Sequence, residues 1–352
     1  MKRRLPAVQG ELRSPLVPVC LFILFLLFGN SAVWAVEFLN GRIKLVLHED
    51  TGRFSLYYLI DIPQQRDIHL RQYDSFFVDS DPRTSFLTVM VNDRTYRLGE
   101  SPSFKIRIRQ SPINPAIIFE SPFLLVTQEF TFIKTLGAEM SNGVRMTIRL
   151  ENRGTGEFST GLRFLLDTNL GEGNAGTPFL VGRQPVTAEF QVDLQKNDPY
   201  WISRNTRFGL MGSILTGEGP RPEVIHFANW KRLNEAPWKL GFAAGRNFNY
   251  LPYSINDSAV SYNFDPQPLA GGASRDYVIL LALADEQGFF LMENVPIEAL
   301  PIKDTREEDL VTLRDLIARL DKHLAGSHIL SDEELAQIEA AIAGLKSRYK
   351  LW

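Results

Sequence analysis

Apolar residues recur along most of the chain in short runs that are typical of β-strands. The runs cover residues 43–47, 54–60, 86–91, 95–98, 104–109, 116–120, 124–133, 144–150, 161–166, 186–192, 223–227 and 276–283. They are rich in β-branched and aromatic residues and are separated by turn residues. No helical segment of about 10 to 15 residues alternates with them, which argues against a parallel α/β fold. The pattern therefore predicts an antiparallel sandwich or barrel.

Two short turns support this prediction locally. The segment Glu49–Gly52 lies between two apolar runs, and Asn92-Asp93 lies between the next two, so both positions predict β-hairpins. At least a dozen strands follow one another without a Pro-, Gly- or Ser-rich linker between them. We therefore expect one large two-sheet domain over residues 36–300 instead of two immunoglobulin-like modules.

The spacing of apolar residues changes after Pro301, and the new spacing predicts two helices. Apolar positions step by three and four residues in each of two stretches, as in the seam between paired helices. They are Leu310, Leu313, Ile317 and Leu320 in the first stretch, and Leu335, Ile338, Ile342 and Leu345 in the second. Residues 301–352 are thus predicted to form a short C-terminal α-helical hairpin. Its interaction seam must be covered, either by the protein's own β domain or by another chain.

The N-terminus has the three parts of a secretory signal peptide. A basic start at residues 2–4 precedes an apolar run at residues 16–28, and Val33 and Ala35 supply the small residues of a cleavage site before Val36. This pattern predicts removal of residues 1–35 and a periplasmic or secreted protein. The alternative is an uncleaved anchor formed by residues 16–39, which would hold the protein at the inner membrane.

Charge and cysteine content narrow the possible partners. Removing residues 1–35 takes away four basic side chains and one acidic side chain, which moves the formal net charge from −3 to −6. An acidic chain lacks the basic surface that nucleic acid or an anionic membrane requires. The single cysteine, Cys20, lies in the predicted signal peptide, so we expect neither disulfides nor thiol catalysis in the mature chain. The sequence predicts no cofactor.

The loop that begins at Asp167 holds the strongest concentration of polar ligands. Gly171 to Gly176 match a dinucleotide-binding glycine pattern, but an extended segment follows them where the pattern needs a helix. Asp167, Asn169 and Glu172 offer oxygen ligands to a cation, although their spacing does not fit an EF-hand. Three interpretations therefore stand: a strand end closed by hydrogen bonds, a cation site, or a catalytic carboxylate.

Aromatic residues gather in a second cluster, which we regard as a candidate binding site. The cluster contains Trp230, Trp238, Tyr250 and Tyr253, together with the basic residue Arg232. Aromatic rings stack on sugar rings, anchor protein interfaces, or simply fill a core. The sequence leaves these three uses open.

Two segments resemble stretches in poorly characterised exported bacterial proteins. They are residues 161–172, which contain Asp-Thr-Asn-Leu-Gly-Glu, and residues 256–260, which read Asn-Asp-Ser-Ala-Val. Those proteins are similar to galactose mutarotases, and the resemblance implies a mainly β fold built as a large antiparallel two-sheet supersandwich. The same fold occurs in epimerases, in noncatalytic domains of glycosidases and in binding modules. The resemblance therefore implies a fold and leaves the activity open.

We expect an exported, noncatalytic cell-envelope protein that binds a protein partner or a glycan. The binding surface would be the β-sandwich, the helical hairpin or both, with no nucleic acid among the partners and contact with the membrane only through an uncleaved signal segment. The alternative is a carbohydrate-active enzyme, an epimerase or lyase, that uses Asp167 or Asp257 with His226. No other catalytic motif supports an enzyme.

Overall fold

The computed structural model describes residues 35–60, 72–77, 83–135, 138–168, 170–172, 178–196 and 199–284. The chain divides into two compact units, Met1–Glu293 and Asn294–Trp352, and all described residues belong to the first. The predicted helical hairpin, including its seam, lies outside the described residues. So does the predicted signal peptide, except for Ala35. Within the described residues, none of the helices has the length and apolar character that a membrane span needs.

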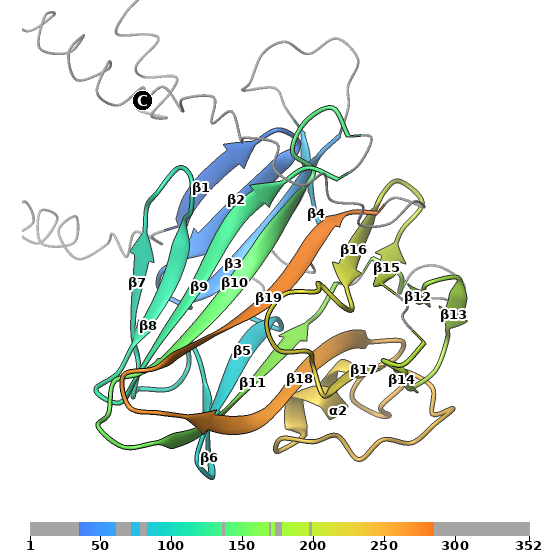
Figure 1. The fold of residues 1–352 in the computed structure, drawn as a ribbon. Helices are drawn as coiled ribbons and strands as arrows, with labels where there is room; N and C mark the ends of the chain where they lie inside the picture. The colour runs from blue at the N-terminus through green and yellow to red at the C-terminus, as the bar shows by residue number, and fades with distance from the viewer. Residues whose placement is uncertain are drawn as a thin grey trace, which may run out of the picture. The chain divides into compact units, whose positions relative to one another are not determined.

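The largest sheet has nine antiparallel strands (Figure 1). In spatial order they are β13 (Gln184–Val186), β12 (Phe179–Val181), β15 (Tyr200–Arg204), β16 (Gly209–Ser213), β19 (Ser274–Leu283), β10 (Gly143–Asn152), β9 (Leu124–Ile133), β8 (Ala116–Glu120) and β7 (Lys105–Arg109). Strand β9 alternates strictly between buried and half-buried residues, because one of its faces packs on the core. The short strand β13 forms one edge of this sheet.

A six-stranded sheet packs against the first. Its order is β14 (Phe190–Gln191), β17 (Val224–Asn229), β18 (Ser258–Leu269), β11 (Phe158–Leu166), β5 (Phe86–Val91) and β6 (Arg94–Arg97). The two-residue strand β14 is an edge, like β13 in the larger sheet. Helix α2 (Trp230–Glu235) follows β17 directly, and Asn229 caps it by accepting a hydrogen bond from the backbone N–H of Arg232 at 3.3 Å.

A four-stranded sheet completes the described residues. It contains β1 (Ala35–Asn40), β2 (Ile43–His48), β3 (Arg53–Leu59) and β4 (Tyr73–Ser75). The predicted hairpins at Gly52 and Asn92 are both present, and each residue has a positive φ, of 60° and 53° respectively. Glycine and asparagine tolerate this backbone conformation best, so the local sequence selects these turns.

Aromatic rings fill the space between the sheets. Phe179 of β12 lies 4.7 Å from Phe227 of β17 between ring centroids, and Tyr277 of β19 lies 4.8 Å from Phe264 of β18. Each pair joins the nine-stranded sheet to the six-stranded sheet, and all four residues belong to one core cluster. Each large apolar side chain buried in this way stabilises the fold by about 1.5 to 3 kcal/mol. The prediction of a mainly β fold with large antiparallel sheets is confirmed.

One polar chain crosses this core. The indole N–H of Trp201 donates to the hydroxyl of Tyr262 at 2.6 Å, and that hydroxyl donates to the carbonyl of Ser213 at 2.6 Å. A Cβ at Gly212 would lie 2.3 Å from the Trp201 indole, so only glycine fits there. The buried polar atoms are satisfied, and the backbone of β16 is held against the indole.

Candidate functional site

The predicted aromatic cluster does not form one surface. Trp238 is buried, with 8% of its surface exposed. Trp230 is half-buried and donates its indole N–H to the carbonyl of Thr84 at 2.8 Å. Tyr250 is also half-buried, and its ring stacks at 5.6 Å on that of Tyr253, which is 69% exposed. The two tryptophans therefore pack within the protein, and of the three uses that the sequence left open, core packing fits these two residues.

Asn229 explains how the loop that carries these tyrosines is held. Its side-chain amide donates to the carbonyls of Phe248 and Asp257 and to the hydroxyl of Ser254, at 2.9, 3.0 and 2.9 Å. One buried side chain thus ties three points of the loop to the start of α2. Leu251 stays 71% exposed at the tip of this loop, so the loop is anchored at its base and open at its tip.

The structure brings together three carboxylates from separate segments. Asp167 follows β11, Glu172 lies five residues later, and Asp257 precedes β18. One carboxylate oxygen from each of the three residues lies within 4.8 Å of those of the other two. Strands β11 and β18 pair with Leu166 opposite Val260, and this register places the end of one strand beside the start of the other. Two of the three predicted cation ligands, Asp167 and Glu172, are thus in one group, and Asn169 lies outside the described residues.

This carboxylate group is poorly solvated. Burial raises the pKa of Glu172, and the nearby charge of Asp257 raises it further, while hydrogen bonds from Ser258 lower it. The backbone N–H of Ser258 donates to Oε1 of Glu172 at 2.7 Å. Burial also raises the pKa of Asp257. The cavity beside Glu172 has a volume of only about 40 Å³, whereas pockets for small-molecule ligands measure about 300 to 1,000 Å³.

His226 lies elsewhere, on β17. Its ring is 5.9 Å from the ring of Phe242, and burial lowers its pKa to about 4. The imidazole is therefore neutral at pH 7 and is not part of the group formed by Asp167 and its two carboxylate neighbours. Of the three residues proposed for the alternative enzyme, the structure unites the two aspartates and leaves the histidine apart.

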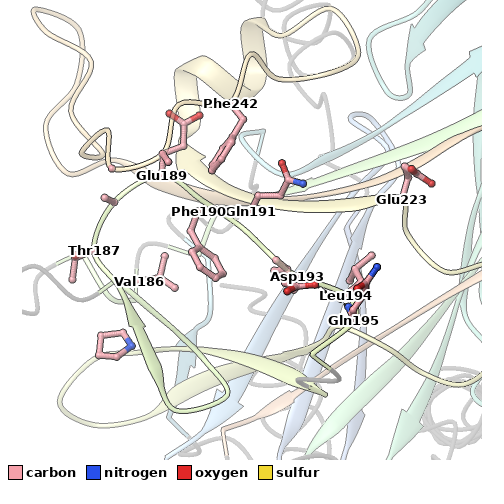
Figure 2. A pocket seen from close by; sticks show the side chains of 15 residues that line it. Val186, Thr187, Glu189, Phe190, Gln191, Asp193, Leu194, Gln195, Glu223 and Phe242 are labelled. Atoms are coloured by element: carbon pink, nitrogen blue, oxygen red, sulfur yellow. Dashed lines mark hydrogen bonds between the residues drawn. The ribbon is translucent and has the colours of Figure 1, made fainter.

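A larger pocket lies at the edge of the sandwich (Figure 2). It has a volume of about 770 Å³ and is lined by residues of β13 and β14, the chain between and after them, Glu223, and the loop that follows α2. Phe190 of β14 contacts the core residue Phe227, at 6.4 Å between ring centroids, whereas Phe242 contacts His226. Phe227 and His226 are neighbours on β17, and neighbouring residues of a strand point to opposite faces of the sheet. The two phenylalanines that contact them, Phe190 and Phe242, therefore lie on opposite faces.

The backbone of β14 adds hydrogen-bonding groups to this pocket. Val192 donates its backbone N–H to the carbonyl of Ile225 at 3.0 Å, in a register where Gln191 lies opposite His226. Hydrogen-bonded and non-bonded pairs alternate in antiparallel strands, so the backbone N–H and C=O of Gln191 point away from β17. Strand β14 is the edge of its sheet, and these groups therefore face the pocket side.

A buried ion pair fixes the two walls of the pocket. Arg232 forms a salt bridge through Nη1 with Glu189, whose side chain is 1% exposed, and donates through Nη2 to the carbonyl of Gly241 at 2.8 Å. The backbone N–H of Glu189 donates to the carbonyl of Arg246 at 2.6 Å. Arg232, predicted as a binding residue, is thus a bridge between the segment before β14 and the loop that carries Phe242.

Sequence reasoning missed the pocket because it predicted one strand over residues 186–192. The alternation of Val186, Ala188 and Phe190 with polar residues supports that interpretation. In the structure the run divides into β13 and β14, and Glu189 lies at the break with its carboxylate turned toward Arg232. A buried acid in a strand pattern needs a cationic partner, and that partner lies 43 residues later in the chain.

Comparison with protein-family models and with the sequences of characterised proteins gives no match. Comparison with solved structures finds similarity to a galactose mutarotase related enzyme from Lactobacillus acidophilus, at a TM-score of 0.43 and 10% identity, covering 73% of this chain and 100% of that one. A galactose mutarotase-like protein from Lactobacillus casei is similar at a TM-score of 0.40 and 10% identity, covering 71% and 100% of the two chains. The expected similarity is confirmed. It concerns structure, at low sequence identity, and assigns no activity.

Proposed function

We propose that this protein is exported to the cell envelope and binds a glycan there without transforming it. The observation that carries the proposal is the edge pocket of Figure 2, in which aromatic, amide and carboxylate side chains line about 770 Å³. The apolar faces of sugar rings pack on aromatic rings such as that of Phe242, which is 39% exposed. Sugar hydroxyls pair with the amides of Gln191 and Gln195 and with the carboxylates.

The interior of the sandwich supports binding over catalysis. The middle of the space between the two large sheets is filled by rings such as those of Trp201 and Phe227, and the polar pocket at its end, beside Thr168 and Arg207, has about half the volume of the edge pocket, about 380 Å³. Of the three grouped carboxylates, Glu172 borders a cavity of about 40 Å³, which is too small for a sugar ring. His226, neutral and distant from that group, provides no acid or base to it.

The edge strand also favours a glycan over a peptide that adds a strand to the sheet. Strand β14 contains only Phe190 and Gln191, and a peptide pairing with it would gain few backbone hydrogen bonds. A glycan needs only isolated donors and acceptors beside an apolar ring. A protein partner on the predicted helical hairpin is a separate proposal, which the truncation described in the Discussion tests.

Binding to an array of bacterial oligosaccharides, followed by calorimetry on the glycans retained, tests the proposal. We expect Phe242→Ala to weaken binding about tenfold, which corresponds to about 1.4 kcal/mol. Ile113→Ala is the matched control, because Ile113 is also an exposed apolar residue, 60% exposed, and does not line the pocket. Equal losses in the two variants, or retention of no glycan by the wild type, would contradict the proposal.

The same samples distinguish binding from catalysis. Bound oligosaccharides should show unchanged anomeric configuration and chain length by NMR after prolonged incubation. Turnover that is lost in Asp167→Asn would establish the alternative, a carbohydrate-active enzyme that works through the carboxylate group.

A further inference from the structure

The ionisable side chains that line the edge pocket are all acids. They are Glu189, Asp193 and Glu223, and no lysine, arginine or histidine is among the lining residues. Glu189 is neutralised by Arg232, whereas Asp193 and Glu223 are exposed on the pocket wall (Figure 2). The pocket is therefore negative on the side that faces solvent.

Two basic groups beside the pocket, Arg232 and Lys196, are paired with its acids, whereas Arg246, which follows the lining residue Gly245, is exposed to solvent and is not among the lining residues. The guanidinium of Arg232 is 12% exposed and divides its donors between Glu189 and the carbonyl of Gly241. Lys196 pairs with Asp193 at 3.8 Å, but this ammonium is 70% exposed, and so the pair is weak and strongly solvated. Lys239 binds Asp265 at 2.6 Å. A carboxylate, phosphate or sulfate on a ligand would find no cation among the lining side chains, and the buried cation behind them, Arg232, is already paired with Glu189.

We propose that the edge pocket selects neutral oligosaccharides and rejects acidic ones. The inference rests on the proposed function, because it names the ligand class of the same site. Carboxylates of the pocket accept charge-assisted hydrogen bonds from sugar hydroxyls, and the same carboxylates repel an acid group on the ligand. Asp193 and Glu223 are thus specificity-determining residues. Arg232 is a positioning residue, because its guanidinium is bound to Glu189 and to the carbonyl of Gly241 and is not available to a ligand.

An array that carries neutral, uronate-containing, phosphorylated and amine-bearing oligosaccharides tests the inference at low salt. The wild type should retain neutral glycans, and each retained glycan should bind at least about tenfold more tightly than its uronate counterpart of equal length. In Asp193→Asn/Glu223→Gln this ratio should fall to within about threefold, since the amides keep the hydrogen bonds and lose the charge. Asp93→Asn is the control, an exposed acid in the β5–β6 turn, and should keep the wild-type ratio.

Each outcome decides between the two proposals. Retention of acidic glycans as tightly as neutral ones, or an unchanged ratio in the double variant, would overturn the selectivity and leave glycan binding intact. Preference for amine-bearing glycans over their neutral counterparts would agree with the negative charge of the pocket and support the rejection of acidic glycans, whereas equal retention of uronate-containing and amine-bearing glycans would overturn it. Retention of no glycan at all would refute the proposed function itself, and the inference with it.

Discussion

Replacing Arg232 by methionine tests whether the buried ion pair holds the pocket wall. The Glu189 side chain is 1% exposed, and within the described part of the chain its Oε1 has no hydrogen-bond partner. The Arg232→Met variant would therefore leave a buried carboxylate without its cation. Breaking a buried pair from one side costs about 3 to 5 kcal/mol, and the 12% exposure of Arg232 places the expected loss near the lower end, about 3 kcal/mol.

Urea unfolding followed by tryptophan fluorescence measures this loss as a change in the free energy of unfolding. The double variant Arg232→Met/Glu189→Met should recover most of it, because apolar replacement of both partners removes the uncompensated charge. We therefore expect a coupling energy of about 2 kcal/mol or more between the two positions.

The pair between Arg149 and Asp276 is the matched control. It has two hydrogen bonds of 2.7 Å, but its side chains are 54% and 37% exposed. Exposed ion pairs contribute about 0 to 1 kcal/mol, so Arg149→Met should change stability little. If Arg232→Met cost no more than Arg149→Met, or if its effect added simply to that of Glu189→Met, the ion pair would not be what fixes the wall.

The remaining predictions concern pH, cations, the hairpin and the signal peptide. Folding lowers the pKa of His226 from 6.5 to about 4, so the unfolded chain takes up a proton at a higher pH than the folded protein does. The free energy of unfolding should therefore fall as the pH drops from 6.5 toward 4. In His226→Gln, the midpoint of urea unfolding should change less with pH over this range. Thermal unfolding should have the same midpoint in excess calcium as in excess EDTA. The reason is that three carboxylates supply only part of the about six to eight oxygens that calcium takes. A rise of the midpoint with calcium that is lost in Asp167→Ala would show a cation site. Truncation after Pro301 should leave the unfolding temperature nearly unchanged and abolish co-purification with an envelope protein; strong destabilisation would mean instead that the hairpin covers its own β domain. Mass spectrometry of the native protein should find an N-terminus at or near Val36, and an intact Met1 in the membrane fraction would support the anchor.

Local signals account for the strands and turns that the sequence predicts correctly. Hairpin turns depend on residues within a few positions, as the positive φ values at Gly52 and Asn92 illustrate. The sequence does not predict β1, β4, β15, β16 or β18. Of these, β18 is the longest, at 12 residues, and contains Pro266 and Pro268. Strand β17 pairs with β18 only from Ser258 to Asn263, so both prolines lie where that side of β18 is open and no backbone N–H is needed. The sequence of β18 alone does not reveal that β17 ends before the two prolines, and so the prolines argue against a strand.

The candidate sites depend on contacts between distant parts of the chain. Asp167 and Asp257 meet because β11 and β18 are paired, which neither residue's own sequence context reveals. Trp238 is buried because Gly161 leaves room for its indole, with the position of a Cβ only 2.8 Å from Cζ2 of the ring. Residues that cluster in sequence, such as the aromatic residues after position 229, therefore separate in space, while isolated acids converge.

The division of the molecule into a filled interior and an open edge has a consequence for function. Among the described residues, the rings that join the two large sheets, such as Trp201, Phe227 and Tyr262, stabilise the fold and fill the middle of the sandwich. The larger edge pocket lies instead where strand pairing ends, at β14. Because Phe242 is 39% exposed and is not part of the main core, Phe242→Ala should weaken ligand binding and leave the free energy of unfolding within about 0.5 kcal/mol of the wild type. Tyr262→Phe should do the reverse: it breaks two buried hydrogen bonds and should lower stability by about 2 to 4 kcal/mol, while glycan affinity measured on the folded fraction stays unchanged. Loss of binding and loss of stability in the same variant, in either case, would mean that the edge and the interior are one cooperative unit and that the pocket is not an independent site.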